Sequence, residues 1–379
     1  MPQGFATAEF KARLKLAQSR MYDVDLDAIL LTTEPDIRYF TGYLTRFWES
    51  PCRPWFLVLP RAGDPIAVIP SIGASLMART WISDIRTWRA PDLDDDGIGL
   101  LAETLRSIGL RIGTPSGLQT HLRMPLDDFA RLNAALPRPI GADAGILRSL
   151  RLVKSEAEIE KIKTACHIAT RAFERVPEIA RVGQPLAAVF RDFQRLCLEE
   201  GADWVPYLAG AAAQGGYGDV ISPADDRPLT AGDILMLDTG LVHSGYFCDF
   251  DRNFAIGSPS PDVAAGHSRL IEATYAAFEA ARPGNTAADL FHVMDKIVTG
   301  SAGGSEAGRY GHGLGMNLTE WPSIIPTDHT PLAPGMVLTL EPGIELAPGH
   351  ALVHEENIVI RENGAEWLSQ PYGAEMRRI

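Results

Sequence analysis

Two aspartates in the second half of the chain are spaced so that their carboxylates can meet. Asp238 ends an apolar run and Asp249 follows eleven residues later, so a hairpin that turns within residues 240–245 could set them side by side. Two like charges at that distance repel each other, and the repulsion costs least when a cation lies between them. Taken alone, the segment is more typical of two solvated acids near a turn, so further ligands are needed to indicate a metal.

A histidine and a glutamate farther along the chain extend this set. His312 lies among glycines in the segment 311–316, where the backbone and the imidazole ring can approach a site closely, although such a setting also occurs in plain turns. Glu341 follows an apolar strand that we expect at 336–340. A turn and a strand end can therefore present these two side chains to the aspartates.

Glu355 and Glu356 lie in a further expected strand, 352–360, and are flanked by apolar residues. Because strand side chains alternate, only one of the two can face inward with the other ligands. Two Asp, one His and two Glu form an oxygen-rich set that suits a pair of divalent ions such as Mn²⁺, Fe²⁺, Co²⁺ or Zn²⁺. Bridging carboxylates would hold such ions roughly 3.5 to 4 Å apart, close enough for one hydroxide to bridge both.

The composition is that of an ordinary globular protein. The chain has 379 residues, of which 46% are hydrophobic and 22% charged, so it can bury a sizeable core and is long enough for two domains. A formal net charge of −13 argues against nucleic-acid binding. No run of 18 apolar residues occurs, so we expect neither a secretory signal nor a membrane span. The cysteines form no CxxC pair, which favours reduced thiols in a cytoplasmic protein. They are Cys52, Cys166, Cys197 and Cys248.

The hydrophobic pattern indicates the elements that must position the ligands. The first third of the chain alternates strands and helices, with strands expected at 27–32, 55–59 and 66–69. The next region opens with a helix whose start is marked by a capping box, Ser155 followed three residues later by Glu158. We predict a mixed α/β (α+β) chain with a boundary near residue 148, between domains at 1–148 and 149–379.

The ligand spacing, and the Arg-Leu-Val-Lys sequence before the capping box, resemble the superfamily of Xaa-Pro dipeptidases, aminopeptidase P, methionine aminopeptidases and creatinase. The resemblance covers essentially the whole chain and implies a creatinase-like N-terminal domain and a C-terminal domain with the pita-bread fold. It implies that Asp238 is the terminal ligand of the first metal and that Asp249 and Glu355 bridge both ions. His312 and Glu341 are then ligands of the second. Creatinase works without metal and does not keep this set intact, so its completeness here indicates a metalloenzyme.

Around the ligands, the sequence departs from the proline-specific members of this superfamily. The loop 214–223 lacks the histidine that they carry before the first aspartate strand, and Thr319 stands where they have a second one. Val353 replaces the Arg that is usual in prolidases, and Asp251 stands where many have Thr. Related lyases that cleave dimethylsulfoniopropionate have Asp at the position of Thr319, so they are not matched either. The proton-shuttling histidines of a peptidase are therefore missing.

Other side chains must then move protons and bind the substrate. We expect Glu341 or Glu355 to take the proton from the metal-bound water, with Asp251 or Asp219 as the nearest spare acid. A tyrosine and an aspartate in the loop that has lost its histidine are candidates for substrate contacts, as is the threonine that replaces the second histidine. These substrate-binding candidates are Tyr217, Asp219 and Thr319.

Arg46 and Trp48 lie in a charged, aromatic turn of the N-terminal domain. Aromatic residues in such a turn usually pack in the core. In the superfamily, however, a loop from the partner's N-terminal domain often caps the active site, so the resemblance implies a homodimer. In that arrangement, Arg46 and Trp48 are candidates for holding a carboxylate or a cationic head group.

The leading hypothesis is a dinuclear metal-dependent hydrolase that resembles Xaa-Pro dipeptidases and cleaves a small peptide or amide bond with a metal-bridging hydroxide. The substrate is expected to be a dipeptide or another small molecule, with no nucleic acid or membrane involved. The alternative is a metal-dependent lyase or hydrolase of a small zwitterion, such as a betaine or a dimethylsulfoniopropionate-like compound. A scaffold protein that has lost turnover is disfavoured, because it has no need for all five metal-binding groups.

Overall fold

The computed structural model describes the chain in three stretches, residues 4–50, 53–302 and 308–379. Cys52 lies outside these stretches. The other cysteines, Cys166, Cys197 and Cys248, are buried free thiols. Among the described helices, none combines the length and the apolar character that crossing a bilayer requires.

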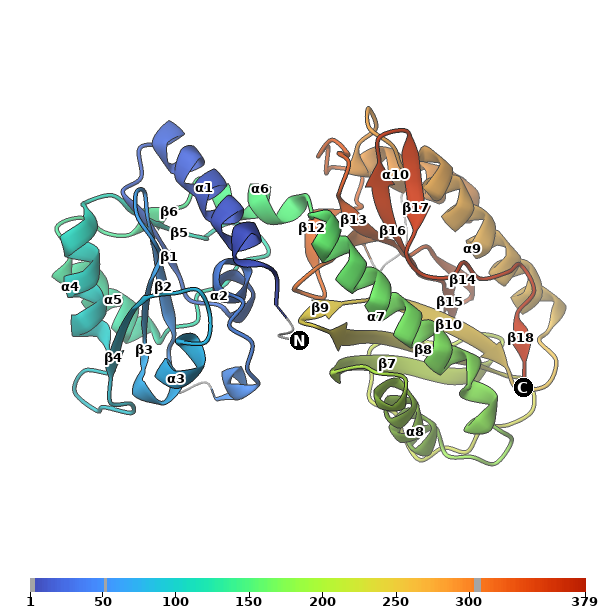
Figure 1. The fold of residues 1–379 in the computed structure, drawn as a ribbon. Coiled ribbons are helices and arrows are strands. Elements are labelled where there is room, and N and C mark those ends of the chain that lie inside the picture. The colour runs from blue at the N-terminus through green and yellow to red at the C-terminus, as the bar shows by residue number, and fades with distance from the viewer. Residues whose placement is uncertain (1–3, 51–52, 303–307) are drawn as a thin grey trace. The chain divides into compact units, whose positions relative to one another are not determined.

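Contacts within the chain divide it into two compact units, Met1–Arg151 and Leu152–Ile379. Figure 1 shows the first unit in blue to green and the second in green to red. Helix α6 (Ile146–Leu152) contains both this division and the boundary that we predict near residue 148. The units are described separately below.

A six-stranded sheet forms the centre of the first unit. Its strands are β1 (Ala28–Leu31), β2 (Phe56–Pro60), β3 (Ile66–Pro70), β4 (Asp84–Trp88), β5 (Ile112–Thr114) and β6 (Gly141–Ala142), in the order β4-β3-β2-β1-β5-β6. β1 pairs antiparallel with β2 and parallel with β5, so the sheet is mixed. The three predicted strands are confirmed as β1, β2 and β3, and β2 and β3 form a hairpin.

Helices pack against this sheet through apolar stripes. They are α1 (Thr7–Asp23), α2 (Glu34–Thr41), α3 (Ala74–Met77), α4 (Ile98–Ile108), α5 (Leu126–Ala135) and α6, with short 3₁₀ turns η1 (Phe47–Glu49) and η2 (Ser71–Gly73). Leu101 and Leu105 of α4 and Leu132 of α5 share one buried cluster with Leu30 and Val58 of the strands. This cluster is the core of the first unit's α4–α5 face.

Two larger sheets and a hairpin form the second unit. One sheet has the order β18-β10-β8-β7, with β9 paired to β8; the other has the order β12-β11-β13-β16-β17; and β14 pairs with β15. The strands of the first sheet are β7 (Trp204–Gln214), β8 (Asp233–His243), β9 (Tyr246–Phe247), β10 (Phe250–Ala255) and β18 (Arg377–Arg378). The others are β11 (His312–Gly313), β12 (Glu320–Ser323), β13 (Val337–Leu340), β14 (Gly343–Ala347), β15 (His350–Val353), β16 (Glu356–Arg361) and β17 (Gly364–Trp367).

Four helices and a 3₁₀ turn complete the described part of the second unit: α7 (Glu156–Glu174), η3 (Val176–Glu178), α8 (Leu186–Glu199), α9 (Pro261–Ala280) and α10 (Ala287–Val298). The predicted capping box is confirmed: the Ser155 side chain accepts from the Glu158 N–H, and the Glu158 carboxylate accepts from the Ser155 N–H. Figure 1 shows α7 and α8 beside the β7–β8–β10 sheet, and α9 and α10 beside the other strands.

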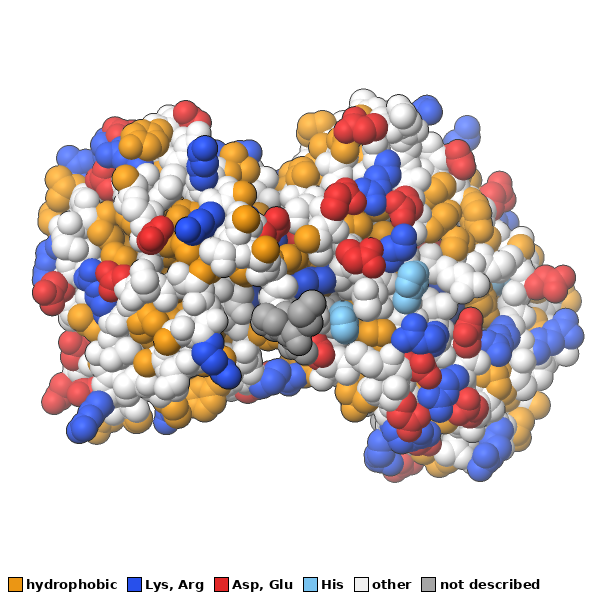
Figure 2. Space-filling view, viewed as in Figure 1, with side chains coloured by type: hydrophobic (Ala, Val, Ile, Leu, Met, Phe, Trp, Pro, Cys, Tyr) orange, Lys and Arg blue, Asp and Glu red, His pale blue; other side chains and the backbone are white. Residues whose placement is uncertain are grey.

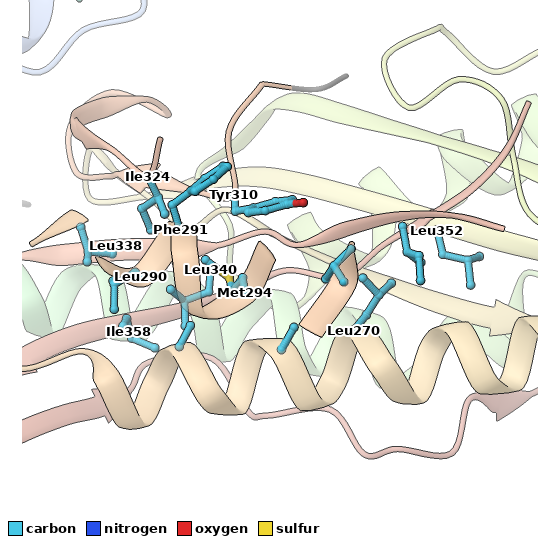
Figure 3. Packing of buried hydrophobic residues seen from close by; sticks show 14 of the residues in the cluster. Leu270, Leu290, Phe291, Met294, Tyr310, Ile324, Leu338, Leu340, Leu352 and Ile358 are labelled. Carbon is cyan, nitrogen blue, oxygen red and sulfur yellow. The ribbon is translucent and has the colours of Figure 1, made fainter. Parts of the chain in front are cut away.

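One buried core of the second unit lies between α9, α10 and the strands that they cover. One buried cluster, shown in Figure 3, contains Leu270 of α9, Phe291 of α10, Leu338 and Leu340 of β13 and Ile358 of β16. All five are at most 2% exposed. The end of β13, where Glu341 follows, is therefore fixed by close packing from one side.

The predicted hairpin around residues 240–245 is confirmed, but its register differs from the expected one. β8 runs straight through residue 240, and the chain turns at Ser244 and Gly245, both with positive φ. The residue opposite Asp238 is Asp251, whereas Asp249 lies just before β10 begins. The position of the turn, at Ser244 and Gly245, sets this register, so Asp251 and not Asp249 lies opposite Asp238.

Charged side chains of both signs are interspersed on the face shown in Figure 2. Opposite charges also pair where α7 and α8 end: Arg175 pairs with Glu178, Glu199 and Glu200 at 2.9 to 3.0 Å. Such pairs cancel at short range, so the net charge of −13 is not gathered into one acidic field there.

Candidate metal centre

The five side chains that we predict as metal ligands come together in the second unit. Ligand atoms of Asp249, His312 and Glu341 all lie within 4.8 Å of one another, and so do those of Asp238, Asp249 and Glu355. Asp249 belongs to both groups, as a ligand shared by two ions would. Glu355 belongs to one group, so its bridging role stays a prediction.

Four of the five ligands lie at an end or a break of a strand, and Asp238 lies in the middle of β8. Asp249 lies just before β10, while His312 begins β11 and Glu341 follows β13. The sequence predicts one continuous strand through Glu355, and this is wrong: β15 ends at residue 353 and β16 begins at 356, so Glu355 lies in the break between them. The break frees the Glu355 side chain from the alternation of a regular strand.

Glu356 faces away from the ligand cluster. Its carboxylate pairs with the Arg252 guanidinium at 3.0 Å and lies 3.4 Å from Nε2 of His354, and all three side chains are buried. Burial lowers the pKa of His354, which favours the neutral ring. Of the two adjacent glutamates, Glu355 therefore serves the site and Glu356 belongs to a separate buried polar network.

His312 is oriented by the backbone and faces two carboxylates. Its Nδ1 lies 2.8 Å from the carbonyl oxygen of Gly313, so Nδ1 carries the proton that is donated there. Nε2 lies 2.9 Å from Glu341 Oε1 and 3.3 Å from Asp249 Oδ2. Burial disfavours a charged ring, but the two carboxylates raise the pKa of His312 to about 10. A proton on Nε2 thus takes the place that a cation would otherwise fill.

The carboxylates have different pKa values because they differ in partners. Burial and the neighbouring carboxylate of Asp249 raise the pKa of Asp238 well above its usual value. Burial and the carboxylate of Asp238 likewise raise the pKa of Glu355. Burial raises the pKa of Asp249 to about 6, although the His312 ring opposes it. The pKa of Glu341 is lowered to about 2, because His312 outweighs the effect of burial.

The donor set fits divalent cations. Oδ1 of Asp238 is buried and has no hydrogen-bond partner among the described residues. An unpaired buried carboxylate oxygen is costly, and a cation beside it removes that cost. Four carboxylates and one imidazole are the oxygen-rich ligands that Mn²⁺, Fe²⁺, Co²⁺ and Zn²⁺ accept.

One cross-strand pair in the second sheet supports three of the ligands. Thr339 of β13 lies opposite Asn357 of β16. The Thr339 hydroxyl accepts from the His312 N–H at 3.0 Å and donates to the Glu341 carboxylate. The Asn357 side chain accepts from the Asp249 N–H at 3.0 Å and donates to the Asp249 carbonyl. The Thr339 and Asn357 side chains thereby hold the backbone of His312 and Asp249 and the carboxylate of Glu341 in place.

All five ligands line one cavity of about 350 Å³. Tyr207, Met236, Leu318 and Val353 give it apolar walls, and Arg309 and Thr319 are further polar groups in its lining. Thr319, predicted as a substrate contact, is therefore placed where it can touch a bound molecule. Sequence reasoning missed Tyr207 and Arg309.

Two predicted spare acids, Asp251 and Asp219, are not in the described cavity lining. Asp251 is buried and accepts from the Glu355 N–H at 2.6 Å and from the Asn253 amide at 3.0 Å. Asp219 is exposed and accepts from the backbone of Ile221 and Ser222, because it caps its own turn. Neither carboxylate is in the described cavity lining, so the structure contradicts their placement as spare acids of the site.

Tyr217 lies in the core of the second unit and not in the loop surface that we expect. It is 1% exposed, its hydroxyl donates to Asn253 Oδ1 at 3.0 Å, and it accepts from the Val353 N–H at 2.8 Å. Burial raises its pKa well above the usual value. The hydroxyl is thus committed to holding the strand that carries Val353, which leaves no direct substrate contact for Tyr217.

In the first unit, Trp48 and Arg46 have different surroundings. Trp48 packs at 5.7 Å from the ring of Trp55 and 6.4 Å from that of Tyr43, with the Arg123 guanidinium 5.1 Å from its ring centre. Arg46 is 55% exposed and lies 3.7 Å from the Glu49 carboxylate. Trp48 thus has the aromatic packing usual for such a turn, while the approach of both residues to a partner's site stays a prediction.

The match to a metallopeptidase family and the similarity to solved dipeptidase structures show that the chain is a metal-dependent hydrolase with the pita-bread fold. The chain belongs to metallopeptidase family M24, whose sequence pattern matches residues 160–362. Residues 13–153 match the creatinase/prolidase N-terminal domain. The predicted superfamily and fold class are confirmed.

Known relatives match along nearly the whole chain. The probable dipeptidase PepE of Mycobacterium tuberculosis (strain H37Rv) is 31% identical, over 95% of this chain and 94% of its own. An Xaa-Pro dipeptidase of Pyrococcus horikoshii is 26% identical, over 91% of this chain and 93% of its own. The crystal structure of dipeptidase PepE from Mycobacterium ulcerans has a TM-score of 0.85 at 30% identity and covers 99% of both chains.

Replacing Asp249 with Ala should release both ions together, because Asp249 is the one ligand that both groups share. After loading with Mn²⁺ and dialysis, the metal content per chain should fall to near zero in Asp249→Ala. Asp262→Ala, which removes an exposed acid at the start of α9, is the matched control and should keep the wild-type content. Full metal content in Asp249→Ala would contradict the shared role.

Replacing Asn357 with Leu should weaken metal binding without removing any ligand. The side chain keeps its approximate size but no longer holds the Asp249 backbone, and loss of such supporting contacts typically costs about 10- to 100-fold in affinity. Calorimetric titration with Mn²⁺ measures the effect, and circular dichroism checks that the variant is folded. Asn133→Leu, which removes an amide from α5 of the other unit, should leave the affinity unchanged. An unaltered affinity in Asn357→Leu would rule out the positioning role.

Proposed function

We propose that this M24 hydrolase is a dinuclear enzyme that cleaves a dipeptide of the Xaa-Pro type. The observation that carries the proposal is the pair of overlapping ligand groups that share Asp249 inside one cavity. A volume of about 350 Å³ is near the lower end for ligand pockets, which suits a small substrate. Relatives named dipeptidase and Xaa-Pro dipeptidase support the same substrate class.

Each metal would have its own ligands in addition to Asp249. Asp238 and Glu355 would hold the first ion, and His312 and Glu341 the second. When bound, such ions would supply Lewis acidity, which polarises a carbonyl group and makes a water molecule a better nucleophile near neutral pH.

The chain itself must position the substrate and move protons. Glu341 and Glu355 both line the cavity, so either carboxylate can accept the proton of the attacking water. The leaving nitrogen must then be protonated, and the O–H groups in the described lining belong to Tyr207 and Thr319. Burial and Asp238 raise the pKa of Tyr207, so its hydroxyl keeps its proton at neutral pH.

One observation favours the alternative, a lyase or hydrolase that acts on a small zwitterion. Among the described residues that line the cavity, the only imidazole is that of His312, which is already a predicted ligand. No second imidazole is placed there to shuttle a proton to an amide leaving group. A substrate with a better leaving group, or with its own proton source, would not need one.

Thr319→His should raise the cleavage of Ala-Pro by the Mn²⁺-loaded enzyme by at least about one order of magnitude, because general acid catalysis is typically worth about 10²- to 10⁴-fold. Thr319→Asn is the control, since an amide fills the position without shuttling protons. Initial rates on Ala-Pro, compared with rates on betaines and ureido acids, separate the two functions. If the wild type already cleaves Ala-Pro at roughly 1 to 10³ per second and Thr319→His adds nothing, the argument from the missing histidines is wrong.

A homodimer is the assembly that we propose, with Arg46 and Trp48 of one subunit near the metal site of the other. The exposure of Arg46 and the family resemblance support it. Sedimentation equilibrium should give twice the chain mass of 41.2 kDa, and Arg46→Ala should lower activity while leaving the mass unchanged. Full activity from a strictly monomeric wild type would contradict the dimer.

A further inference from the structure

Arg309 brings a positive charge into the wall of the metal cavity. Among the described residues that line the cavity, it is the only Lys or Arg. The guanidinium helps to lower the pKa values of Asp249 and Glu341, so its charge acts directly on the ligand cluster. Any anionic group that enters the described cavity therefore has one obvious cationic partner.

The guanidinium retains hydrogen-bonding capacity. Within the described part of the chain, its one hydrogen bond is a long one, 3.5 Å from Nη2 to the Thr319 hydroxyl, and it pairs with no carboxylate. An arginine carries five N–H donors in a planar fork that matches the two oxygens of a carboxylate. Thr319 can therefore orient the Arg309 guanidinium, while most of the guanidinium N–H donors stay available to a ligand.

Charge balance shows why an acidic substrate would need this residue. Asp238, Asp249, Glu341 and Glu355 supply four negative charges, which two divalent ions would just neutralise. The ions would then leave no excess positive charge for an anionic substrate. Arg309 supplies that charge, and the apolar walls formed by Met236, Leu318 and Val353 strengthen an ion pair made there.

We propose that Arg309 binds the C-terminal carboxylate of the substrate and thereby selects peptides that end one residue after the scissile bond. This inference rests on the proposed dipeptidase function and assigns its specificity to one residue. Each further residue would carry the carboxylate roughly 3.3 to 3.6 Å farther from the scissile bond. A guanidinium held beside the ligand cluster could not then pair with the carboxylate while the scissile carbonyl lies at the metals.

The test compares Ala-Pro with Ala-Pro-amide, which has the same scissile bond but no terminal charge. In the Mn²⁺-loaded wild type, we expect kcat/KM to favour Ala-Pro by roughly 10- to 100-fold, as for a hydrogen-bonded ion pair. In Arg309→Met, this preference should fall to near one, with the loss on Ala-Pro mainly in KM. Arg309→Lys should retain part of the preference, because it keeps the charge but not the fork.

Arg269→Met, at an exposed position of α9, controls for the loss of one positive charge and should behave as the wild type. Equal losses on both substrates in Arg309→Met, or an unchanged preference, would overturn the assignment. Metal content, measured on the same samples, shows whether Arg309 merely balances the ligand charges. A large loss of metal in Arg309→Met would also overturn it.

Binding of L-proline and prolinamide to the Mn²⁺-loaded protein separates this inference from the proposed function. L-proline should bind the wild type at least about tenfold more tightly than prolinamide, and Arg309→Met should remove the difference. If the wild type cleaves no Xaa-Pro dipeptide, the proposed function fails, and the calorimetric comparison still decides whether Arg309 binds a carboxylate.

Discussion

Mutual repulsion among four carboxylates in one cavity is the constraint on which the second unit is built. Asp238, Asp249, Glu341 and Glu355 would not approach each other in a flexible chain, because each pair of charges raises the free energy as it leaves water. The fold must hold them together with interactions made elsewhere. In the ion-free protein, a proton on His312 and protons retained by buried acids relieve part of the strain. Divalent cations relieve more, since they add positive charge without displacing a ligand.

The scaffold meets this constraint by attaching the ligands to buried backbone. The Thr339–Asn357 pair links the second sheet to His312, Glu341 and Asp249, so their relative positions follow from one strand register. The glycines around His312 serve the same purpose. A Cβ on Gly313 would lie 1.8 Å from the Trp321 carbonyl oxygen, and a Cβ on Gly311, whose φ is 140°, would lie 2.3 Å from the Thr339 carbonyl oxygen of β13. Only glycine lets β11 fit between its neighbours there, and so lets the imidazole reach the acids.

The cluster of candidate metal ligands could be predicted from the sequence, because each member is a ligating side chain at the end of an apolar run or in a glycine-rich segment. Acids at the ends of apolar strands are costly unless they have a partner, and this makes Asp238 or Glu341 conspicuous. The predictions for Tyr217, Asp219 and Asp251 depended on where a side chain points, which is decided by tertiary packing. Tyr217 is drawn into the core and Asp251 is turned toward the Glu355 backbone by a register that the hairpin length sets. Tyr207 gave no local signal, because β7 is distant in sequence from the predicted metal ligands, whereas Arg309 lies three residues before His312 and only the folded chain places it in the cavity wall.

The proposed arrangement would separate two tasks that a single histidine often combines, binding the substrate and delivering a proton. Arg309 and Thr319 are in hydrogen-bond contact in the cavity wall, so a carboxylate bound there would bring the leaving nitrogen near the threonine hydroxyl. Threonine is a poor acid, so proton delivery would contribute little to the rate. Orientation can still contribute much, since holding reacting groups in place is worth up to about 7 to 11 kcal/mol of the barrier in favourable cases. Such an enzyme would depend on holding its substrate in a fixed orientation. In the described cavity, the Arg309 guanidinium is the group whose spare donors can bind a carboxylate for this purpose.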